Sequence, residues 1–379
     1  MDEMIRSGIA SLCSRYPAEY WRDLDSKRAY PEEFVREMAR QGWLSVLIPR
    51  EYGGGGGSLQ QGSIILEEVN ASGGNAAACH AQMYTVAALL RHGSEEQKRS
   101  FLPRIASGEL RLQAFGITEP GAGSDTTRIS TFARKVAGGY VVDGQKVFTS
   151  RVQHSDLMLL VARTRRYEEV ETKTDGISLF LVDIKEAGDH MRVSPIRTMI
   201  NHETNSVHIE DLRLDERSLI GEEGKGFRYL LDALNAERIL IAAECVGDAR
   251  WFIRKAVDYS GQRTVFGRPI GKNQGVQFPI AAAYARTRAA DLMRRRAAEL
   301  FDEGKKCGEE SNIAKYLASE ASWEAANVAM NVLGGYGMAA DMDVERKFRE
   351  NRLYMVAPVS NNLVLSYIGE HVLGLPRSF

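Results

Sequence analysis

The chain is poor in cysteine and carries almost no net charge. Only four of its 379 residues are cysteines, and no two of them form a Cys-x-x-Cys pair. This thiol usage is typical of a reducing compartment and does not indicate a disulfide framework or a metal site. The 49 basic and 50 acidic residues give a net charge of −1, so no overall field attracts nucleic acid or an anionic membrane.

The sequence also lacks features of secretion and of membrane insertion. Its first residues, MDEMIRSGIASLC, contain no basic segment followed by an apolar one, so no secretory signal is visible. No uninterrupted apolar run approaches the ~20 residues that span a bilayer. The densest basic run, RTRAADLMRRR at 286–296, has no interleaved aromatic residue, and we interpret it as a solvated helix face. We therefore expect a cytoplasmic protein without a nucleic-acid partner.

Residues 1–112 are predicted to be helical. The segment PEEFVREMARQGWLSVLI has apolar residues at helical spacing, and Pro31 with two glutamates suits a helix start. A second pair of helices is predicted to break at Gly73 and Gly74, and Ser94 with Gln97 forms a capping box. The five-glycine run at 53–57 is followed by no Gly-Lys-Ser/Thr motif, so it is predicted to be a flexible connector.

From residue 113 to residue 220 the apolar period changes to two. The segment GYVVDGQKVFTS carries Asp143-Gly144 between β-rich flanks, which predicts a hairpin turn there. After residue 220 three long apolar-periodic segments return to the helical period. The sequence thus predicts a mainly α protein with three domains: helical over 1–112, antiparallel β over 113–220, and a helical bundle over 221–379.

The stretch FGITEPGAGSD at 115–125 carries the strongest chemical signal. It leaves a strand and turns through Gly121 and Gly123, which let the backbone approach a planar or anionic ligand. KVFTS follows at 146–150, RTVFGRPIGKNQ at 263–274, and NVLGGYGM at 331–338. In order and spacing these four segments resemble the acyl-CoA dehydrogenase family, and the resemblance covers the whole chain.

The resemblance implies a known arrangement: an N-terminal helical domain, a middle β domain and a C-terminal four-helix bundle, with FAD between the last two. It assigns flavin-lining strand and loop positions to Phe115, Ile117, Thr118, Gly123 and Ser124. Ser124 would also lie near the thioester end of the substrate. At the end of the later strand, Phe148 occupies an aromatic position against the flavin, Thr149 follows it, and Ser150 stands where a hydroxyl meets flavin N5 and O4. A donor there favours the charge that arrives on the ring.

The other cofactor positions implied by the resemblance are Arg263, Phe266, Gln274, Asn331, Gly334, Gly335, Ser360 and Asn362. The first three match a segment that a neighbouring subunit contributes, in which the arginine pairs with pyrophosphate and the phenylalanine packs near adenine. Positions 331–335 match a loop at the other end of FAD, although glutamine is usual at 331. The last two fall where the family closes over the cofactor. A shared FAD implies at least a dimer, and a dimer of dimers is usual in the family.

The usual catalytic base of the family is absent from this sequence. Most members carry a glutamate in a Tyr-Glu-Gly-Thr-like turn, and the matching segment RENRLYMVAPVS places Pro358 at that position. Some members carry the base on the helix that opens the bundle, and the matching residue here is Glu237. Glu237 lies in an apolar stripe, where desolvation makes a carboxylate a better base, although an ion pair with a neighbour is the alternative reading. Glu244, seven residues on, is a second candidate that we expect to be structural.

Three further positions bear on the substrate. Arg238 matches an arginine that the family keeps behind the active site, and Asn235 stands where many relatives have an aspartate near the acyl-CoA. In relatives the backbone N–H at the position of Pro358 donates to the thioester carbonyl, and proline has no N–H. The backbone N–H of Val359 could serve in its place, or the chemistry could differ.

The resemblance predicts an FAD-dependent acyl-CoA dehydrogenase that passes electrons to an electron-transfer flavoprotein, with no metal. Two other functions fit the same scaffold: a flavin monooxygenase or oxidase, and a non-catalytic subunit that binds FAD or acyl-CoA. The intact TEPGAGSD stretch and Glu237 favour the dehydrogenase, while the nature of the acyl chain stays open.

Overall fold

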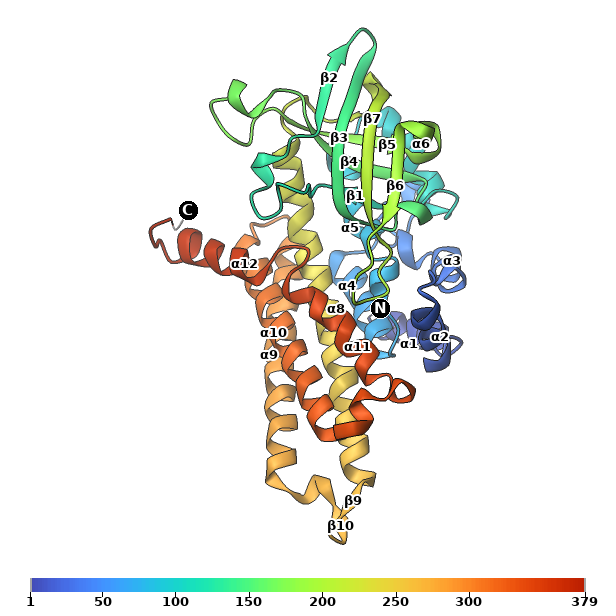
Figure 1. The fold of residues 1–379 in the computed structure, drawn as a ribbon, viewed down its shortest axis with the longest axis vertical. Coiled ribbons are helices and arrows are strands. Elements are labelled where there is room, and N and C mark those ends of the chain that lie inside the picture. Colours follow the sequence, from blue (N-terminus) through green and yellow to red (C-terminus); the bar gives the residue numbers. More distant parts are fainter. Residues whose placement is uncertain (1, 378–379) are drawn as a thin grey trace.

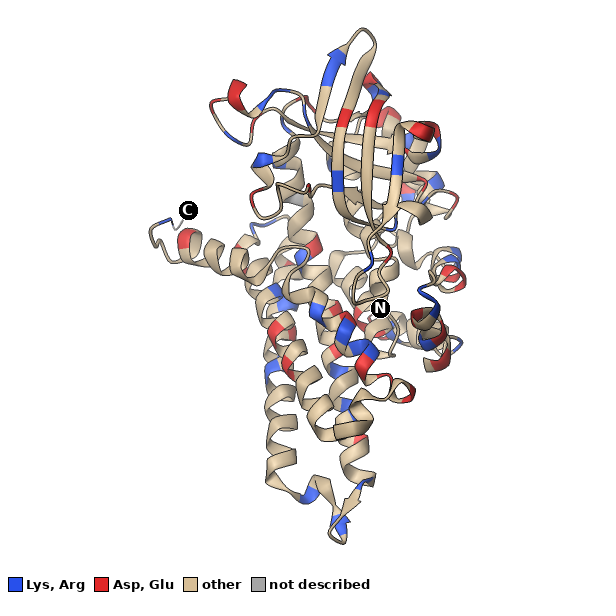
Figure 2. Cartoon of the chain, viewed as in Figure 1, with Lys and Arg blue, Asp and Glu red and all other residues tan. Residues whose placement is uncertain are grey.

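The computed structural model describes residues 2–377, except for the side chain of Asp232. Helices come first, a sheet follows, and long helices complete the chain (Figure 1), which confirms the predicted fold class. The sheet lies at one end of the elongated molecule, and the long helices extend away from it. Acidic and basic residues are intermixed along the chain in the view of Figure 2. None of the described helices is both long and apolar enough to cross a membrane.

Six helices form the N-terminal part: α1 Asp2–Cys13, α2 Ala18–Lys27, α3 Glu32–Arg40, α4 Leu59–Ala71, α5 Ala81–His92 and α6 Glu95–Ala106. Their starts follow local sequence signals. Pro31 precedes α3 at its N-cap, and the predicted capping box at Ser94 and Gln97 opens α6 with both hydrogen bonds made. The chain turns at Gly73 and Gly74 between α4 and α5, as predicted.

Eight strands form the main sheet: β1 Leu112–Gly116, β2 Phe132–Val136, β3 Gly139–Ser150, β4 Leu157–Arg163, β5 Ile177–Asp183, β6 Met191–Pro195, β7 Thr204–Asp215 and β8 Leu219–Ile220. The strand order is β6-β7-β3-β2-β4-β5-β8, and β1 pairs with β4. The pairing is antiparallel except where β1 and β2 meet β4 in parallel. A short helix, α7 (Ile184–Ala187), follows β5.

The C-terminal part is built on three long helices: α8 Gly226–Gln262, α9 Gln274–Asp302 and α10 Gly308–Leu333. The short strands β9 (Thr264–Val265) and β10 (Arg268–Pro269) join α8 to α9 as a hairpin, and α11 (Val344–Asn351) and α12 (Asn361–Tyr367) follow α10. At 37 residues, α8 is about 55 Å long and reaches from the sheet to the far tip of the molecule (Figure 1). Residues 236–250 of α8 pack against α4 and α5, where a continuous apolar core forms.

Three local predictions from the sequence are wrong. Asp143-Gly144 forms no turn: β3 runs through it with a shift in register, and the hairpin with β2 turns at Gly138 instead. The glycine run at 53–57 is no flexible connector, because its N–H groups donate to carbonyls of 45–50 and a Cβ on Gly54 would lie 2.1 Å from the Ile48 oxygen. The basic run at 286–296 is not wholly solvated, since Arg294 is fully buried against α4.

Candidate active site

The loop that follows β1 is fixed by a buried ion pair. Lys146 is fully buried, and its Nζ donates to Glu119 Oε1 at 2.8 Å and to the carbonyl of Ile117 at 3.0 Å. Glu119 also accepts from the backbone N–H groups of Ser130 and Thr131. Burial alone would raise the pKa of Glu119, but the charge and hydrogen bonds of Lys146 outweigh it and lower the pKa to about 2. These contacts therefore fix the loop that carries TEPGAGSD to β3.

The outer side of this loop is open. A Cβ added at Gly121 or at Gly123 would meet nothing within 4 Å, and Ser124 is exposed. At the end of β3 the ring of Phe148 is 62% exposed, and the φ angle of this residue is +56°. Next to it, the Thr149 hydroxyl is buried without a hydrogen-bond partner among the described residues.

The exposed surface here therefore consists of the backbone at Gly121 and Gly123 and the ring of Phe148. Phe115, Ile117 and Thr118 on β1 and just beyond it are half-buried, as is Ser150. An uncovered aromatic ring and open glycines leave surface that a flat ring system can contact. We call residues 115–124 and 148–150 the flavin-loop group. Their geometry fits the flavin end of FAD.

Glu237 lies in the first third of α8 and is 5% exposed. Burial raises the pKa of its carboxyl to about 7, and the charge of Glu244 acts in the same direction. The charge of Arg238 and the nearby hydroxyl of Tyr84 act in the opposite direction and reduce the rise in the pKa. Arg238 donates from Nη1 to Asn235 Oδ1 at 3.1 Å, so the two positions assigned to the substrate contact each other. A carboxyl with a pKa near 7 is suited to general-base chemistry.

Glu244 lies two turns further along α8, and both of its oxygens are engaged. His80 Nδ1 is 2.6 Å from Oε1, and the Tyr354 hydroxyl donates to Oε2 at 3.0 Å. Asn70 donates to the same tyrosine oxygen at 3.1 Å. Because Glu244 is fully buried and held from three elements, it holds helices together and has no free oxygen to present. This supports the structural role expected for it.

Sequence reasoning missed the partners of these carboxylates. Tyr84 lies on α5 and His80 is the N-cap residue of that helix, four residues before it and so on the same face. Neither residue lies in one of the four segments that carry the family resemblance. Their four-residue spacing, compared with the seven-residue spacing of Glu237 and Glu244, is the signal that could have suggested that these two helix faces meet.

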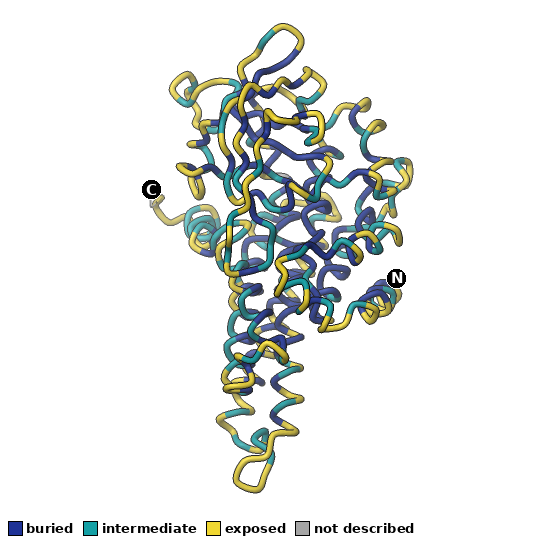
Figure 3. The backbone as a smooth tube through the Cα atoms, turned by 45° about the vertical axis from the view of Figure 1, so that its right-hand side comes forward, coloured by how far each residue is buried: buried dark blue, intermediate teal, exposed yellow. Residues whose placement is uncertain are grey.

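A second group of predicted cofactor residues lies at the far tip of the molecule. Arg263, Phe266 and Gln274, which we call the hairpin group, flank the β9–β10 hairpin and are all exposed. The Phe266 ring is 100% exposed, and the φ angle of this residue is +51°. In Figure 3 the tip carrying this hairpin is the most exposed end of the long helices. A single chain does not bring the hairpin group to the flavin-loop group, because most of α8 separates them (Figure 1).

The remaining predicted cofactor positions are divided between two places. Asn331 and the two glycines at 334 and 335 are exposed at the end of α10, where the Tyr336 ring lies 6.1 Å from that of Tyr259 near the end of α8. Ser360 caps α12 by accepting from the backbone N–H of Leu363 at 3.4 Å, and Asn362 is exposed. Thus the positions at the end of α10 lie at the same end of the molecule as the hairpin group, whereas Ser360 and Asn362 lie beside the middle of the bundle.

The loop that carries Pro358 packs on α8. Tyr354, four residues before the proline, reaches Glu244, and Asn361, three residues after it, accepts from the buried Lys315 Nζ at 2.6 Å. Pro358 itself is exposed and has neither a carboxylate nor an N–H. Of the described buried carboxylates on α8, Glu244 contacts His80 and Asp248 pairs with Lys347, whereas Glu237 forms no salt bridge with a described residue.

Comparison with known proteins identifies the family. Models of the N-terminal, middle and C-terminal domains of acyl-CoA dehydrogenase match residues 1–109, 114–212 and 224–373. The chain is 34% identical over 380 residues to acyl-CoA dehydrogenase FadE12 of Mycobacterium tuberculosis, covering 100% of this chain and 97% of that protein. It is 32% identical over 337 residues to the caffeyl-CoA reductase-Etf complex subunit CarC of Acetobacterium woodii, covering 88% of each chain.

Solved structures give the same result. The glutaryl-coenzyme A dehydrogenase structure in complex with glutaryl-CoA superposes with a TM-score of 0.93 at 28% identity, covering 100% of this chain and 96% of that one. The chain therefore belongs to the acyl-CoA dehydrogenase family. It is an oxidoreductase acting on CH–CH groups, and FAD is its cofactor.

Proposed function

We propose that the protein catalyses the FAD-dependent α,β-dehydrogenation of an acyl-CoA thioester to the trans-2-enoyl-CoA, with Glu237 as the α-proton base. The observation that carries the proposal is the state of Glu237. Its carboxyl is buried on α8, and burial raises its pKa to about 7. The family's other base position holds Pro358, which cannot accept a proton.

The flavin-loop group would hold the flavin end of FAD. When bound, FAD supplies an acceptor at N5 for the hydride that leaves the substrate β-carbon. By the family pattern, Phe148 would cover one face of the ring system, Thr149 and Ser150 would offer hydroxyl groups, and the loop around Gly123 and Ser124 would lie beside the pyrophosphate. These assignments rest on the family pattern together with the open surfaces at these positions.

Glu237 takes the α-proton as the substrate loses a hydride from the β-carbon. The α C–H electron pair becomes the new C=C bond, and the carboxylate becomes a neutral carboxylic acid. A buried, poorly solvated carboxylate makes this transfer easier, because its protonated form is favoured at its site. By the family pattern we assign Arg238 and Asn235, which contact each other on α8, to the substrate together with Ser124.

The assembly and the electron acceptor belong to the same proposal. The exposed hairpin group and the glycines at 334 and 335 would complete the FAD site of a second copy, so we propose a homo-oligomer of dimers. Arg263 has the planar fork that suits pyrophosphate. We propose an electron-transfer flavoprotein as the acceptor, which the name of the CarC relative supports, and a role in fatty acid metabolism.

Anaerobic titration of the purified holoenzyme with a panel of acyl-CoAs tests this function. Prompt bleaching of the flavin absorbance supports a dehydrogenase. Absence of bleaching with every thioester, together with rapid reoxidation of the chemically reduced enzyme by oxygen, would favour an oxidase or monooxygenase. A protein that takes up no FAD, or that binds acyl-CoA without any reaction, would favour a non-catalytic subunit.

The base is tested by a matched pair of variants on one helix. Glu237→Gln should keep FAD and lose substrate-dependent bleaching by at least a hundredfold, because the amide cannot accept the proton. Glu244→Gln, two turns away, should keep the reaction in whatever fraction of the protein folds. An active Glu237→Gln enzyme beside an inactive, folded Glu244→Gln enzyme would overturn the assignment.

A further inference from the structure

The end of β3 meets β7 through two residues with left-handed backbones. Ser150 is the last residue of β3 and pairs with Thr204 on β7. The next residue, Arg151, has a φ angle of +59°, and its backbone N–H donates at 3.0 Å to the carbonyl of Glu203, whose φ angle is +44°. Residues other than glycine disfavour this conformation, so further contacts must hold the two residues in it.

The side chain of Arg151 makes one of these contacts. It is 2% exposed, and its Nη2 lies 3.0 Å from Nε2 and 3.2 Å from Nδ1 of His202. Burial lowers the pKa of His202 well below its usual range, and the charges of Arg151 and His80 act in the same direction. The imidazole therefore stays neutral and accepts from the guanidinium. Among the described residues, His202 is the one side-chain partner of Arg151, which forms no salt bridge with them.

The loop that carries His202 is anchored to two helices. Asn201 donates from its side chain to two carbonyls at and just beyond the end of α2, at 3.2 and 2.9 Å. Arg349 on α11 donates from Nη1 to the carbonyl of Met199 at 3.1 Å. The connection between β6 and β7 is thus held by the helical part of the molecule, and His202 extends that hold to Arg151.

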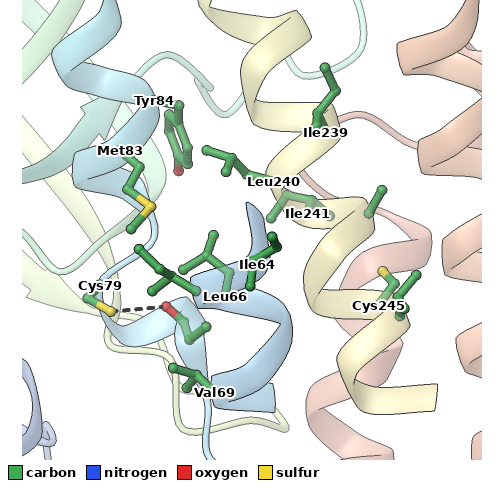
Figure 4. Close-up of a cluster of buried hydrophobic side chains, with 14 of the residues drawn as sticks. Ile64, Leu66, Val69, Cys79, Met83, Tyr84, Ile239, Leu240, Ile241 and Cys245 are labelled. Carbon is green, nitrogen blue, oxygen red and sulfur yellow. Dashed lines mark hydrogen bonds between the residues drawn. The ribbon is translucent and has the colours of Figure 1, made fainter. Parts of the chain in front are cut away.

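A small cavity lies beside this contact. Its volume is about 30 Å³, and Arg151, His202 and Glu203 line it from the β domain. Residues of α2, of α11 and of the turn between α4 and α5 close the other side, the last through Ala78. That turn continues into Cys79, which Figure 4 shows among the apolar side chains between α4, α5 and α8. The guanidinium is therefore confined, because the space beside it admits only about two water molecules.

Residues 148–150 lie between two buried cations. Lys146 precedes them and pairs with Glu119. Arg151 follows them and contacts His202. Between the two cations the register of β3 with β7 shifts, and the backbone at position 148 is left-handed. An irregular strand end is not oriented by a regular ladder of hydrogen bonds, so the contacts of the two cations determine how it lies.

From these contacts we propose that Arg151 is a positioning residue of the flavin site: its contact with His202 fixes how residues 148–150 face the flavin. The inference rests on the proposed placement of the flavin against these residues. With the contact intact, a hydroxyl at the end of β3 meets the ring at a fixed angle, where a donor favours the negative charge that arrives with the hydride. Without the contact the donor is misplaced, and the bound flavin is harder to reduce.

The test measures the midpoint potential of the bound flavin in the substrate-free holoenzyme. Arg151→Met and His202→Leu should each lower the equilibrium constant for flavin reduction about tenfold, which is about 30 mV for a two-electron couple. Arg151→Met also removes a charge, whereas His202→Leu keeps it, so a shift in Arg151→Met alone would overturn the proposal. The double variant should match the single variants, because each removes the same contact, and additive shifts would contradict it.

Arg294→Met is the matched control. Arg294 is fully buried, but it lies on α9 against α4, and its partners Asp291 and Glu67 each keep another arginine. Its loss should lower stability and leave the flavin potential unchanged. If Arg151→Met and His202→Leu do not fold, Arg151→Lys keeps the charge but loses the planar fork, and it should lower the potential by a smaller amount. An unchanged potential in Arg151→Lys would overturn the proposal.

The same measurement separates this proposal from the proposed reaction. Because the flavin is reduced chemically, the potentials do not depend on which substrate the protein takes. An unmodified enzyme that no thioester bleaches would contradict the reaction but not the role of Arg151. Unchanged potentials in Arg151→Met and His202→Leu would contradict the role of Arg151 but not the reaction.

Discussion

The flavin-loop group and the hairpin group differ in how far a single chain completes them. Beneath the first, Lys146 and Glu119 are paired and buried, and nearby backbone groups are hydrogen-bonded to them. At the second, the ring of Phe266 has no cover and Arg263 is exposed. A large apolar side chain left fully exposed at a turn stabilises nothing in the monomer.

The two groups are therefore held in place by different contacts. The flavin-loop group is held from within the fold, so changes there should damage both folding and cofactor binding. The hairpin group makes few contacts within its own chain and is proposed to contact FAD and a second copy. Changes there should therefore affect cofactor binding and assembly but leave the fold of each chain intact. The following predictions test that separation.

Lys146→Met should have the largest effect. It leaves the carboxylate of Glu119 buried without its cation, which costs about 3–5 kcal/mol of the free energy of unfolding. The loop should loosen, and FAD should be lost on gel filtration. Chemical denaturation and flavin absorbance measure both effects.

The control for this variant is Lys135→Met. Lys135 pairs with Glu223 at 2.8 Å on the solvent side of the same domain, where an exposed pair contributes about 0–1 kcal/mol. Equal losses of stability in the two variants would contradict the account of the buried pair. The double variant Lys146→Met with Glu119→Gln should recover part of the stability, because no unpaired charge remains buried.

Arg263→Ala should weaken FAD binding without weakening the fold. A charged hydrogen-bonding contact to pyrophosphate accounts for about a 10- to 100-fold change in the FAD dissociation constant. Since Arg263 is exposed in the chain, the unfolding midpoint of the apoprotein should stay the same. Fluorescence titration with FAD and thermal melts of the apoprotein check the two parts.

Arg288→Ala is the matched control, since Arg288 is exposed on α9 away from the hairpin. Its FAD affinity should equal that of the unmodified protein. A drop in apoprotein stability in Arg263→Ala would show that the hairpin group is part of the fold of the single chain, and the contrast between the two groups would fail.

The pH dependence of flavin reduction provides a third test, within the buried half of the site. Glu237 must be ionised to act as a base, and burial raises its pKa to about 7. The rate should therefore rise with pH and level off above about pH 8, with roughly a tenfold span between pH 6 and pH 8. Stopped-flow absorbance under anaerobic conditions measures it, and a flat profile over this range would contradict Glu237 as the base.

The same raised pKa makes a prediction for stability. A carboxyl whose folded pKa lies above its unfolded value contributes most below the unfolded pKa, and that contribution is lost as pH rises through about 7. The unmodified protein should therefore lose stability between about pH 5 and pH 7, and this loss should be absent in Glu237→Gln. Urea denaturation of both proteins across this range checks the sign.

Structural features could be predicted from the sequence where the interacting residues are close along the chain, and could not where they are far apart. The capping box at Ser94, the helix start after Pro31 and the long helices followed from neighbouring residues, and they are confirmed. The family pattern led to Glu237 on α8. Local signals failed where tertiary contacts outweighed them, as at Asp143-Gly144, where pairing with β7 continues past the predicted turn.

The contacts that explain the site could not be predicted in the same way. Lys146 contacts Glu119 across 27 positions of the chain, and His80 contacts Glu244 across 164. Their pairing depends on how β3 lies under the loop and how α5 crosses α8, which no periodicity of one segment specifies. Arg294 shows the same limit, because a basic helix face becomes buried only when α4 supplies its acidic partner.

Ser94→Ala should have the smallest effect, and it sharpens the comparison most. The Ser94 hydroxyl accepts from the Gln97 N–H at 3.1 Å in the capping box of α6, away from both groups, and its loss costs about 1 kcal/mol. FAD affinity and the pH midpoint should not change. If this general loss of stability also released FAD, the loss of FAD in Lys146→Met would reflect stability alone; if FAD stays bound, the buried pair acts on the loop itself.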